Sequence, residues 1–198
     1  QYPIPWKTAL YISGSLLLNK PRSFHKDSLA CISLLNPPLH IAGSQHIPSN
    51  GACLLTLNHY SRPGFPAWWL ALAVSAAVPM EIHWVMTAAW RFDNKPFARP
   101  LTASTNLLFR RIAQVYGFTN MPPMPPSAAE TQRRAIAIRR VLRYAQRTPN
   151  PVIGLSPEGM DFPEGKLGKP PVGVGRFIVS LMAHCQTIIP IGIYEEAS

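Results

Sequence analysis

Short apolar runs alternate along the chain with longer segments in which apolar residues recur every three or four positions. Four runs bounded by proline, glycine or polar residues are mainly apolar: residues 52–57, 82–86, 151–155 and 187–193. Runs of this length and composition are typical of buried strands, and we expect a strand at each of them. We expect a further strand at residues 39–43.

The longer segments have the spacing and punctuation of helices. We expect helices over residues 6–18, 23–35, 66–78, 96–115, 127–147 and 173–185. An interruption is expected near Arg99 and Pro100, because proline removes a main-chain donor. Ser127 and Glu130 have the spacing of a capping box at a helix start. The buried side of that helix is expected to hold Ile136, Val141, Leu142 and Ala145.

This alternation of strands and helices predicts an α/β fold with a mixed, largely parallel sheet flanked by helices. With 198 residues, the chain is long enough for one domain with a sizeable core. We expect an N-terminal helical segment over residues 1–38, followed by a single α/β domain over residues 39–198. Because the chain opens with Gln1 and stops at Ser198 after an expected strand, we expect its natural termini to lie elsewhere.

Positive charge is concentrated in one part of the chain. The net charge is +10, and residues 94–157 hold ten Lys or Arg residues against one acidic residue. A basic surface suits nucleic acid, anionic lipid or a phosphorylated small molecule. The expected helix 127–147 has six arginines but only Tyr144 as an aromatic residue, and no nucleic-acid motif accompanies it. We therefore expect an anionic membrane surface rather than nucleic acid as a partner.

No segment has the pattern of a membrane span. The uncharged run from Pro63 to Met80 is broken by prolines to a helix of about 20 Å, shorter than the ~30 Å hydrocarbon core. Residues 28–61 contain no charged residue, and Trp6 and Tyr11 accompany a leucine-rich segment near the start. These features predict a cytoplasmic protein that is peripheral at a membrane.

Three cysteines are widely spaced in apolar surroundings, at Cys31, Cys53 and Cys185. Their odd number and their spacing do not match a disulfide framework or a metal site. We expect buried free thiols, which suit a reducing compartment, and no bound metal.

Two polar loops directly follow expected strands. Asn58 and His59 come after residues 52–57, and the segment 156–159 comes after residues 151–155. Ligands of α/β sheets usually bind beyond the carboxyl ends of the strands. A histidine with an ordinary pKa can act there as a general base near neutral pH.

The residues of these loops resemble the two signature blocks of the glycerol-phosphate and lysophosphatidic acid acyltransferase superfamily. Asn58, His59 and Ser61 match the Asn-His-x-x-x-x-Asp block, and Pro157, Glu158 and Gly159 match the Phe-Pro-Glu-Gly block. Further similarity in residues 43–48, 169–177 and 188–191 extends the resemblance over roughly residues 39–194. Gly64 stands where the family has its aspartate, and Met160-Asp161 where it usually has Thr-Arg.

The resemblance implies transfer of a fatty acyl group from a thioester to a hydroxyl acceptor. The donor would be acyl-coenzyme A or acyl carrier protein, and no other cofactor is implied. The acceptor would be lipid-like or small, including lysophospholipid and glycerol-phosphate types. His59 would be the general base, Ser61 and Arg62 would contact the acceptor with Asn58, and Ser156, Pro157, Glu158 and Gly159 would shape its pocket.

Gly64 raises the question of what orients the histidine, since an acidic partner normally fixes the imidazole tautomer. Asp93, Asp161 or Glu158 offers a replacement carboxylate, and a main-chain carbonyl offers another solution. The third possibility is a catalytically silent acyltransferase-like protein that binds lipid or coenzyme A. We favour the enzyme, because a silent site has no chemical need for His59 and Glu158.

A serine hydrolase is a further alternative interpretation of the sequence. Ser156, Asp161 and His184 follow one another in nucleophile, acid and base order. However, Pro157 has no N–H where such enzymes need an oxyanion donor, and the second glycine of the nucleophile elbow is missing. The sequence therefore argues against this reading.

Overall fold

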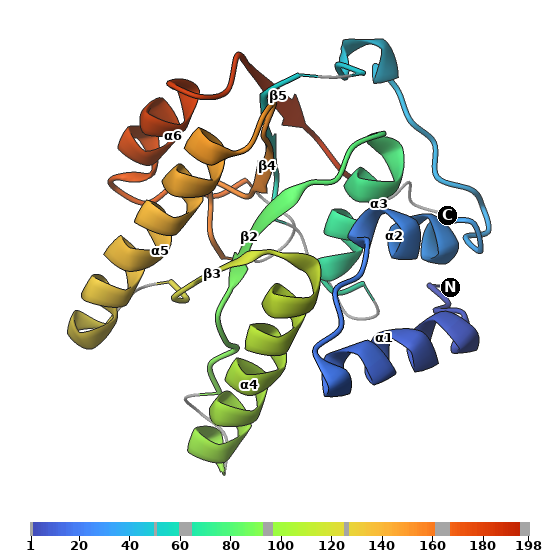
Figure 1. Cartoon of the computed structure of the whole chain (residues 1–198), viewed down its shortest axis with the longest axis horizontal. Helices are drawn as coiled ribbons and strands as arrows, with labels where there is room; N and C mark the ends of the chain where they lie inside the picture. The colour runs from blue at the N-terminus through green and yellow to red at the C-terminus, as the bar shows by residue number, and fades with distance from the viewer. Residues whose placement is uncertain are drawn as a thin grey trace.

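Five strands and six α-helices alternate in the computed structural model (Figure 1), which describes residues 2–49, 51–59, 65–92, 97–124, 127–160 and 167–194. The helices are α1 (Trp6–Leu18), α2 (Phe24–Ile32), α3 (Trp68–Ala77), α4 (Ala98–Tyr116), α5 (Ala128–Arg147) and α6 (Val174–Met182), with a short 3-10 helix, η1 (Ser44–His46). The strands are β1 (Cys53–Leu57), β2 (His83–Thr87), β3 (Thr119–Met121), β4 (Val152–Leu155) and β5 (Thr187–Ile191).

The strands form one sheet in the order β3-β2-β4-β1-β5. Every described pairing in it is parallel. The expected α/β class is confirmed, and the sheet is uniformly parallel in the described part of the chain rather than mixed. Because all strands run the same way, the loops that follow them gather at one edge, which we call the carboxyl edge.

Helices cover both faces of the sheet (Figure 1), as the two-sided burial of a parallel sheet requires. Alternate side chains of β1 face opposite layers. Leu55 packs in a cluster with residues of α2 and α3, and Leu54 packs in a second cluster with residues of α5 and α6. The cysteines belong to these two clusters and are buried and free, as expected.

The sequence prediction of a strand at residues 39–43 was wrong. This segment has no sheet partner, and Ile41 within it is 44% exposed. Gly43 adopts a left-handed conformation with φ of 78°, which begins η1 instead of extending a strand. The strand β3, in contrast, was not expected, because it is only three residues long and includes the polar residues Thr119 and Asn120.

The expected interruption of α4 was also wrong. Pro100 is the third residue of this helix, within the first turn, where main-chain N–H groups have no intrahelical partner in any case. In α5 the capping box of Ser127 and Glu130 is confirmed, and Val141 and Ala145 are buried. Ile136 is 45% exposed, contrary to expectation, because Ala137 rather than Ile136 lies on the buried side of the helix.

No helix in the described part of the chain combines the length and the apolar character needed to cross a bilayer. Among the described α-helices, only α1 has no buried residue.

His83 joins the sheet to α5 inside the core. Its ring stacks on Tyr144, with centroids 3.8 Å apart and planes inclined by 17°. Its Nε2 lies 2.9 Å from the hydroxyl of Thr119. Burial lowers the pKa of His83 to about 4, against the opposing effect of a hydrogen bond to the main chain at Gly117.

This buried histidine should make stability depend on pH. The unfolded chain takes up a proton near pH 6.5, whereas the folded His83 does so near pH 4, so the neutral form favours folding. The free energy of unfolding should therefore fall as the pH drops from about 6.5 to 4, with this residue contributing up to about 1.4 kcal/mol per pH unit. Urea titrations at several pH values should find this contribution missing in His83→Gln. Parallel pH profiles for the two proteins would contradict the prediction.

Candidate functional site

The two loops singled out in the sequence meet at the carboxyl edge of the sheet. β1 and β4 are neighbours in register, with Cys53 opposite Val152 and Thr56 opposite Leu155. The residues that follow each strand therefore emerge side by side. Parallel pairing thus brings together His59 and Glu158, which are 99 residues apart in the chain.

The carboxylate of Glu158 joins three segments. One oxygen, Oε1, accepts the main-chain N–H of His59 at 2.9 Å. The other, Oε2, accepts the main-chain N–H of Gly168 at 2.6 Å. The side chain is 5% exposed, so both hydrogen bonds are made away from bulk water. Glu158 therefore fixes the main chain of the histidine loop, which makes it a positioning residue.

Asn58 fastens the same loop to the end of the sheet. Its Nδ2 donates to the carbonyl of Ile193 at 2.9 Å, and its Oδ1 accepts the N–H of Ile193 at 2.8 Å. This two-way pairing extends the contact between β1 and β5 beyond the last residue of each strand. Asn58 thus holds His59 in place from the side opposite Glu158.

The segment from Ser156 to Gly159 forms a tight turn after β4. The N–H of Gly159 donates to the carbonyl of Ser156 at 3.2 Å, and Gly159 has a φ of 70°. This positive φ favours glycine, and a Cβ at this position would lie 3.3 Å from the side chain of Met124, which would have to shift slightly. The hydroxyl oxygen of Ser156 is buried and has no hydrogen-bond partner among the described residues.

A cavity of about 1150 Å3, here called the central cavity, opens beside these loops. Asn58, His59 and Ser156 lie on its wall, and His59 is half-buried. Most of the remaining wall is apolar, and α1, α3 and α4 contribute Ile12, Leu70 and Phe109 to it. A few polar groups at one end of a large apolar space are typical of a site for an amphiphilic ligand.

Arg134 of α5 also lines the central cavity. It is half-buried, and burial lowers the pKa of its guanidinium group. Nη1 donates to the carbonyl of Pro122 at 3.1 Å, and no described carboxylate forms an ion pair with it. A partly desolvated cation without a counter-ion is a candidate binding group for an anion.

Arg134 is not among the site residues expected from the sequence, although the helical period contains the signal. Arg134, Ile138, Val141 and Ala145 recur at spacings of four, three and four residues. This is the spacing of one helix face, and its last two members were predicted to be buried. An arginine in line with an apolar stripe indicates a cation that faces the interior.

The carboxylate of Asp27, which also lies on the cavity wall, already has hydrogen-bond partners within the protein. Asp27 is 5% exposed and accepts hydrogen bonds from Arg22 Nε and from the Tyr116 hydroxyl, each at 2.8 Å. Arg22 also forms an ion pair with this carboxylate. Burial, followed by the hydrogen bond to Asp27, raises the pKa of Tyr116 well above its usual range. This network links α2 to α4 and is best understood as structural.

Several predicted site residues lie outside the described part of the chain. These are Ser61, Arg62, Gly64, Asp93 and Asp161. The tripeptide Pro-Glu-Gly also recurs at residues 163–165, outside the described part. Among the described residues, no group of histidine, cysteine or acidic side chains has the arrangement of a metal site. For the hydrolase reading, Ser156 lines the central cavity and His184 does not.

Comparison with models of protein families, with curated proteins and with solved structures finds no match to this chain.

The position of Glu158 leads to a prediction about the histidine loop. Glu158→Ala should remove the carboxylate acceptor of the N–H groups of His59 and Gly168, at a cost of about 2–4 kcal/mol of unfolding free energy. Hydrogen exchange at the His59 amide should accelerate by at least tenfold in the native state. Glu130→Ala, which removes a capping box and the ion pair with Arg91, should cost about 1–2 kcal/mol and leave that exchange rate unchanged. Equal exchange of the His59 amide in wild type and Glu158→Ala would refute this role.

Proposed function

We propose that this protein is an acyltransferase that moves a fatty acyl group from a thioester to a hydroxyl acceptor, with His59 as the general base. The observation that carries the proposal is the junction of two sequence-distant loops at the central cavity. The His59 N–H is held by Glu158 at 2.9 Å, and His59 and Ser156 line an apolar space of about 1150 Å3. The resemblance of these loops to the two acyltransferase signature blocks supports the same reaction.

The central cavity suits an acyl chain because its walls are mainly apolar. Each methylene group that leaves water for such a wall contributes about 0.8 kcal/mol to binding. Ile12, Leu70 and Phe109 supply side chains of this kind from three different helices. The reacting carbonyl of the thioester would then lie at the polar end, beside His59.

The proposed reaction uses groups of this polar end. His59 takes the proton from the acceptor hydroxyl while its oxygen attacks the thioester carbonyl carbon. The oxyanion that forms needs a donor, and the Ser156 hydroxyl is available because its oxygen is buried without a described partner. Collapse of the intermediate breaks the carbon–sulfur bond, and the proton on His59 passes to the departing sulfur. The products are an ester and a free thiol.

Arg134 supports an acceptor that carries an anionic group. Its guanidinium lines the same cavity as His59, and a phosphate would replace the water that burial has removed from it. A lysophospholipid or a glycerol phosphate has both the hydroxyl and the anion that this pairing requires. We propose Arg134 as the group that selects such acceptors.

The exposed surface of α1 supports peripheral binding to a membrane. Trp6, Tyr11 and Leu17 on this helix are 67%, 67% and 81% exposed. Lys7 lies over the Trp6 ring at 5.6 Å from its centroid. Aromatic, aliphatic and basic side chains in this mixture suit a bilayer interface. Because Ile12 and Leu16 of α1 line the central cavity, a lipid leaving the interface would enter it beside this helix.

Gly64 favours a second candidate, a catalytically silent protein that binds acyl lipid or coenzyme A. The family's aspartate orients the imidazole, and glycine has no side chain for this task. The two candidates share the cavity and differ only in whether His59 performs chemistry.

A single substitution separates the two candidates. His59→Ala should lower thiol release from acyl-coenzyme A or acyl carrier protein by at least 10²-fold, because the general base is lost. Affinity for a fluorescent fatty acid should change by less than threefold. His40→Ala, at an exposed histidine, is the matched control and should retain activity. If the wild type releases no thiol with any hydroxyl or amine acceptor, the enzyme proposal fails and the binding protein remains.

The proposed role of Arg134 has its own test. Arg134→Gln should raise KM for a phosphorylated acceptor by about 10- to 100-fold, since a charge-assisted hydrogen bond contributes about 1.5–3 kcal/mol. KM for an uncharged acceptor should change by less than threefold, and Arg134→Lys should restore part of the loss. Arg133→Gln removes the same charge from an exposed neighbour and should leave both values unchanged. Equal effects on both acceptors would exclude the role.

A further inference from the structure

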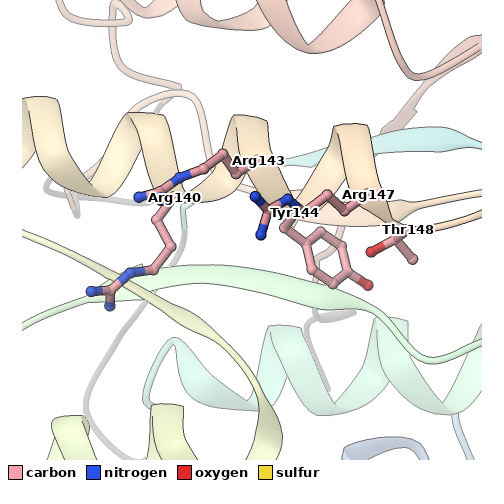
Figure 2. Close-up of a pocket in the computed structure, with 5 residues that line it drawn as sticks. All are labelled: Arg140, Arg143, Tyr144, Arg147 and Thr148. Carbon is pink, nitrogen blue, oxygen red and sulfur yellow. The ribbon is translucent and has the colours of Figure 1, made fainter.

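The end of α5 that leads into β4 carries a cluster of exposed arginines. Arg140, Arg143 and Arg147 lie along one side of the helix (Figure 2), because spacings of three and four residues return to the same side. With Tyr144 and Thr148 they line a hollow of about 390 Å3, here called the arginine hollow.

The arginine hollow is separate from the candidate active site. None of its five residues lines the central cavity, which α5 reaches through Arg134 and Ile138 near its other end. Because α5 leads from the carboxyl edge back to the start of β4, Arg147 lies toward the opposite edge of the sheet. The helix α1, which we propose as the membrane contact, also lies away from this end of α5 in Figure 1.

No described carboxylate neutralises the arginine hollow. Ion pairs in the described part of the chain join Arg22 to Asp27 and Arg91 to Glu130, and neither involves the hollow. Glu130 is the sole acidic residue of α5 and stands about 15 Å of helix rise before Arg140.

Glu81 is the carboxylate whose charge acts on Tyr144. It already accepts hydrogen bonds from the Ser23 hydroxyl and from the main-chain N–H of His25. These neutral donors leave the charge of Glu81 in place, but three guanidinium groups outnumber this one carboxylate, so the hollow retains a net positive charge.

The stability of α5 does not explain why three arginines lie together at this end of the helix. A cation is favoured by the helix dipole only in the last turn, which includes Arg147 but neither Arg140 nor Arg143. Like charges at spacings of three and four residues also destabilise a helix. The cluster thus opposes local stability, and a bound anion would offset that cost.

The geometry fits phosphate better than other anions. All six basic residues of α5 are arginine, whose planar fork matches phosphate oxygens. From Arg140 to Arg147 the charges extend over about 10 Å of helix rise, enough for two phosphates. The Tyr144 ring is stacked on His83 at 3.8 Å, so it is not a free platform for a nucleobase. A nucleic-acid strand is therefore less well matched than a terminal diphosphate.

We propose that the arginine hollow is a binding site for a diphosphate group, with Arg140, Arg143 and Arg147 as its cationic walls. Tyr144 and Thr148 supply hydroxyl groups beside them. The diphosphate group belongs either to a soluble small molecule or to a lipid headgroup.

Binding of inorganic pyrophosphate, measured by calorimetry at fixed ionic strength, tests the soluble source. We expect one binding site per chain. The double variant Arg140→Gln/Arg147→Gln should lower the affinity for pyrophosphate by at least tenfold. Arg133→Gln/Arg139→Gln removes the same charge from the same helix outside the hollow and should change affinity by less than threefold. Circular dichroism checks that both variants keep the helix content of the wild type.

Flotation with vesicles of phosphatidylcholine containing a diphosphate-headgroup lipid tests the lipid source. Loss of flotation in Arg140→Gln/Arg147→Gln, but not in the control pair, supports the site even without pyrophosphate binding. The proposal is overturned if the two variants behave alike in both assays. It is also overturned if sulfate competes as well as pyrophosphate, or if single-stranded RNA without a terminal phosphate binds the hollow equally well. These binding assays need no acyl transfer, so their outcome is independent of the role of His59.

Discussion

The parallel pairing of β1 with β4 is the constraint on which the candidate site depends. Only this pairing places the buried carboxylate of Glu158 within 2.9 Å of the His59 amide. A shift of register by one residue would turn the apolar side chains of β4 to the opposite layers. It would also remove Glu158 from the histidine loop. The core therefore enforces the geometry of the polar loops, because the same register satisfies both.

Much of the fold was predictable because local signals agreed with the final packing. The apolar runs that became β1 and β4 are buried between two layers of helices, the run that became β5 pairs at the edge of the sheet, and the Ser127 capping box marks the start of α5. The failures concern features that depend on neighbours. β3 is a strand only because Val85 to Thr87 lie beside it, whereas the segment around Ile41 has no such partner. Burial and pairing of this kind are not encoded in a short window of residues.

The candidate site was predictable in part for the same reason. His59 and Glu158 each directly follow an apolar run, so a parallel sheet brings them to one edge whatever the details of the helices. The partner of Asn58 was not predictable, because its contact with Ile193 joins residues 135 positions apart at the end of another strand. The position of Arg134 on the cavity wall was not predictable, because the sequence does not show which helix faces the cavity. Its place on the apolar stripe of α5 indicated only that it points toward the interior.

The walls of the central cavity differ in how firmly they are held. α3 contributes several fully packed residues, among them Trp69 and Leu70 at 2% exposure, so moving it would disrupt the core. α1 contributes Ile12 and Leu16 to the wall but buries no residue of its own. Because the residues of α1 are at most half-buried, displacing α1 requires less free energy than displacing α3. The volume of the cavity on that side can therefore vary, and we expect the protein to accommodate ligands of unequal length by moving α1 while the carboxyl edge of the sheet stays rigid.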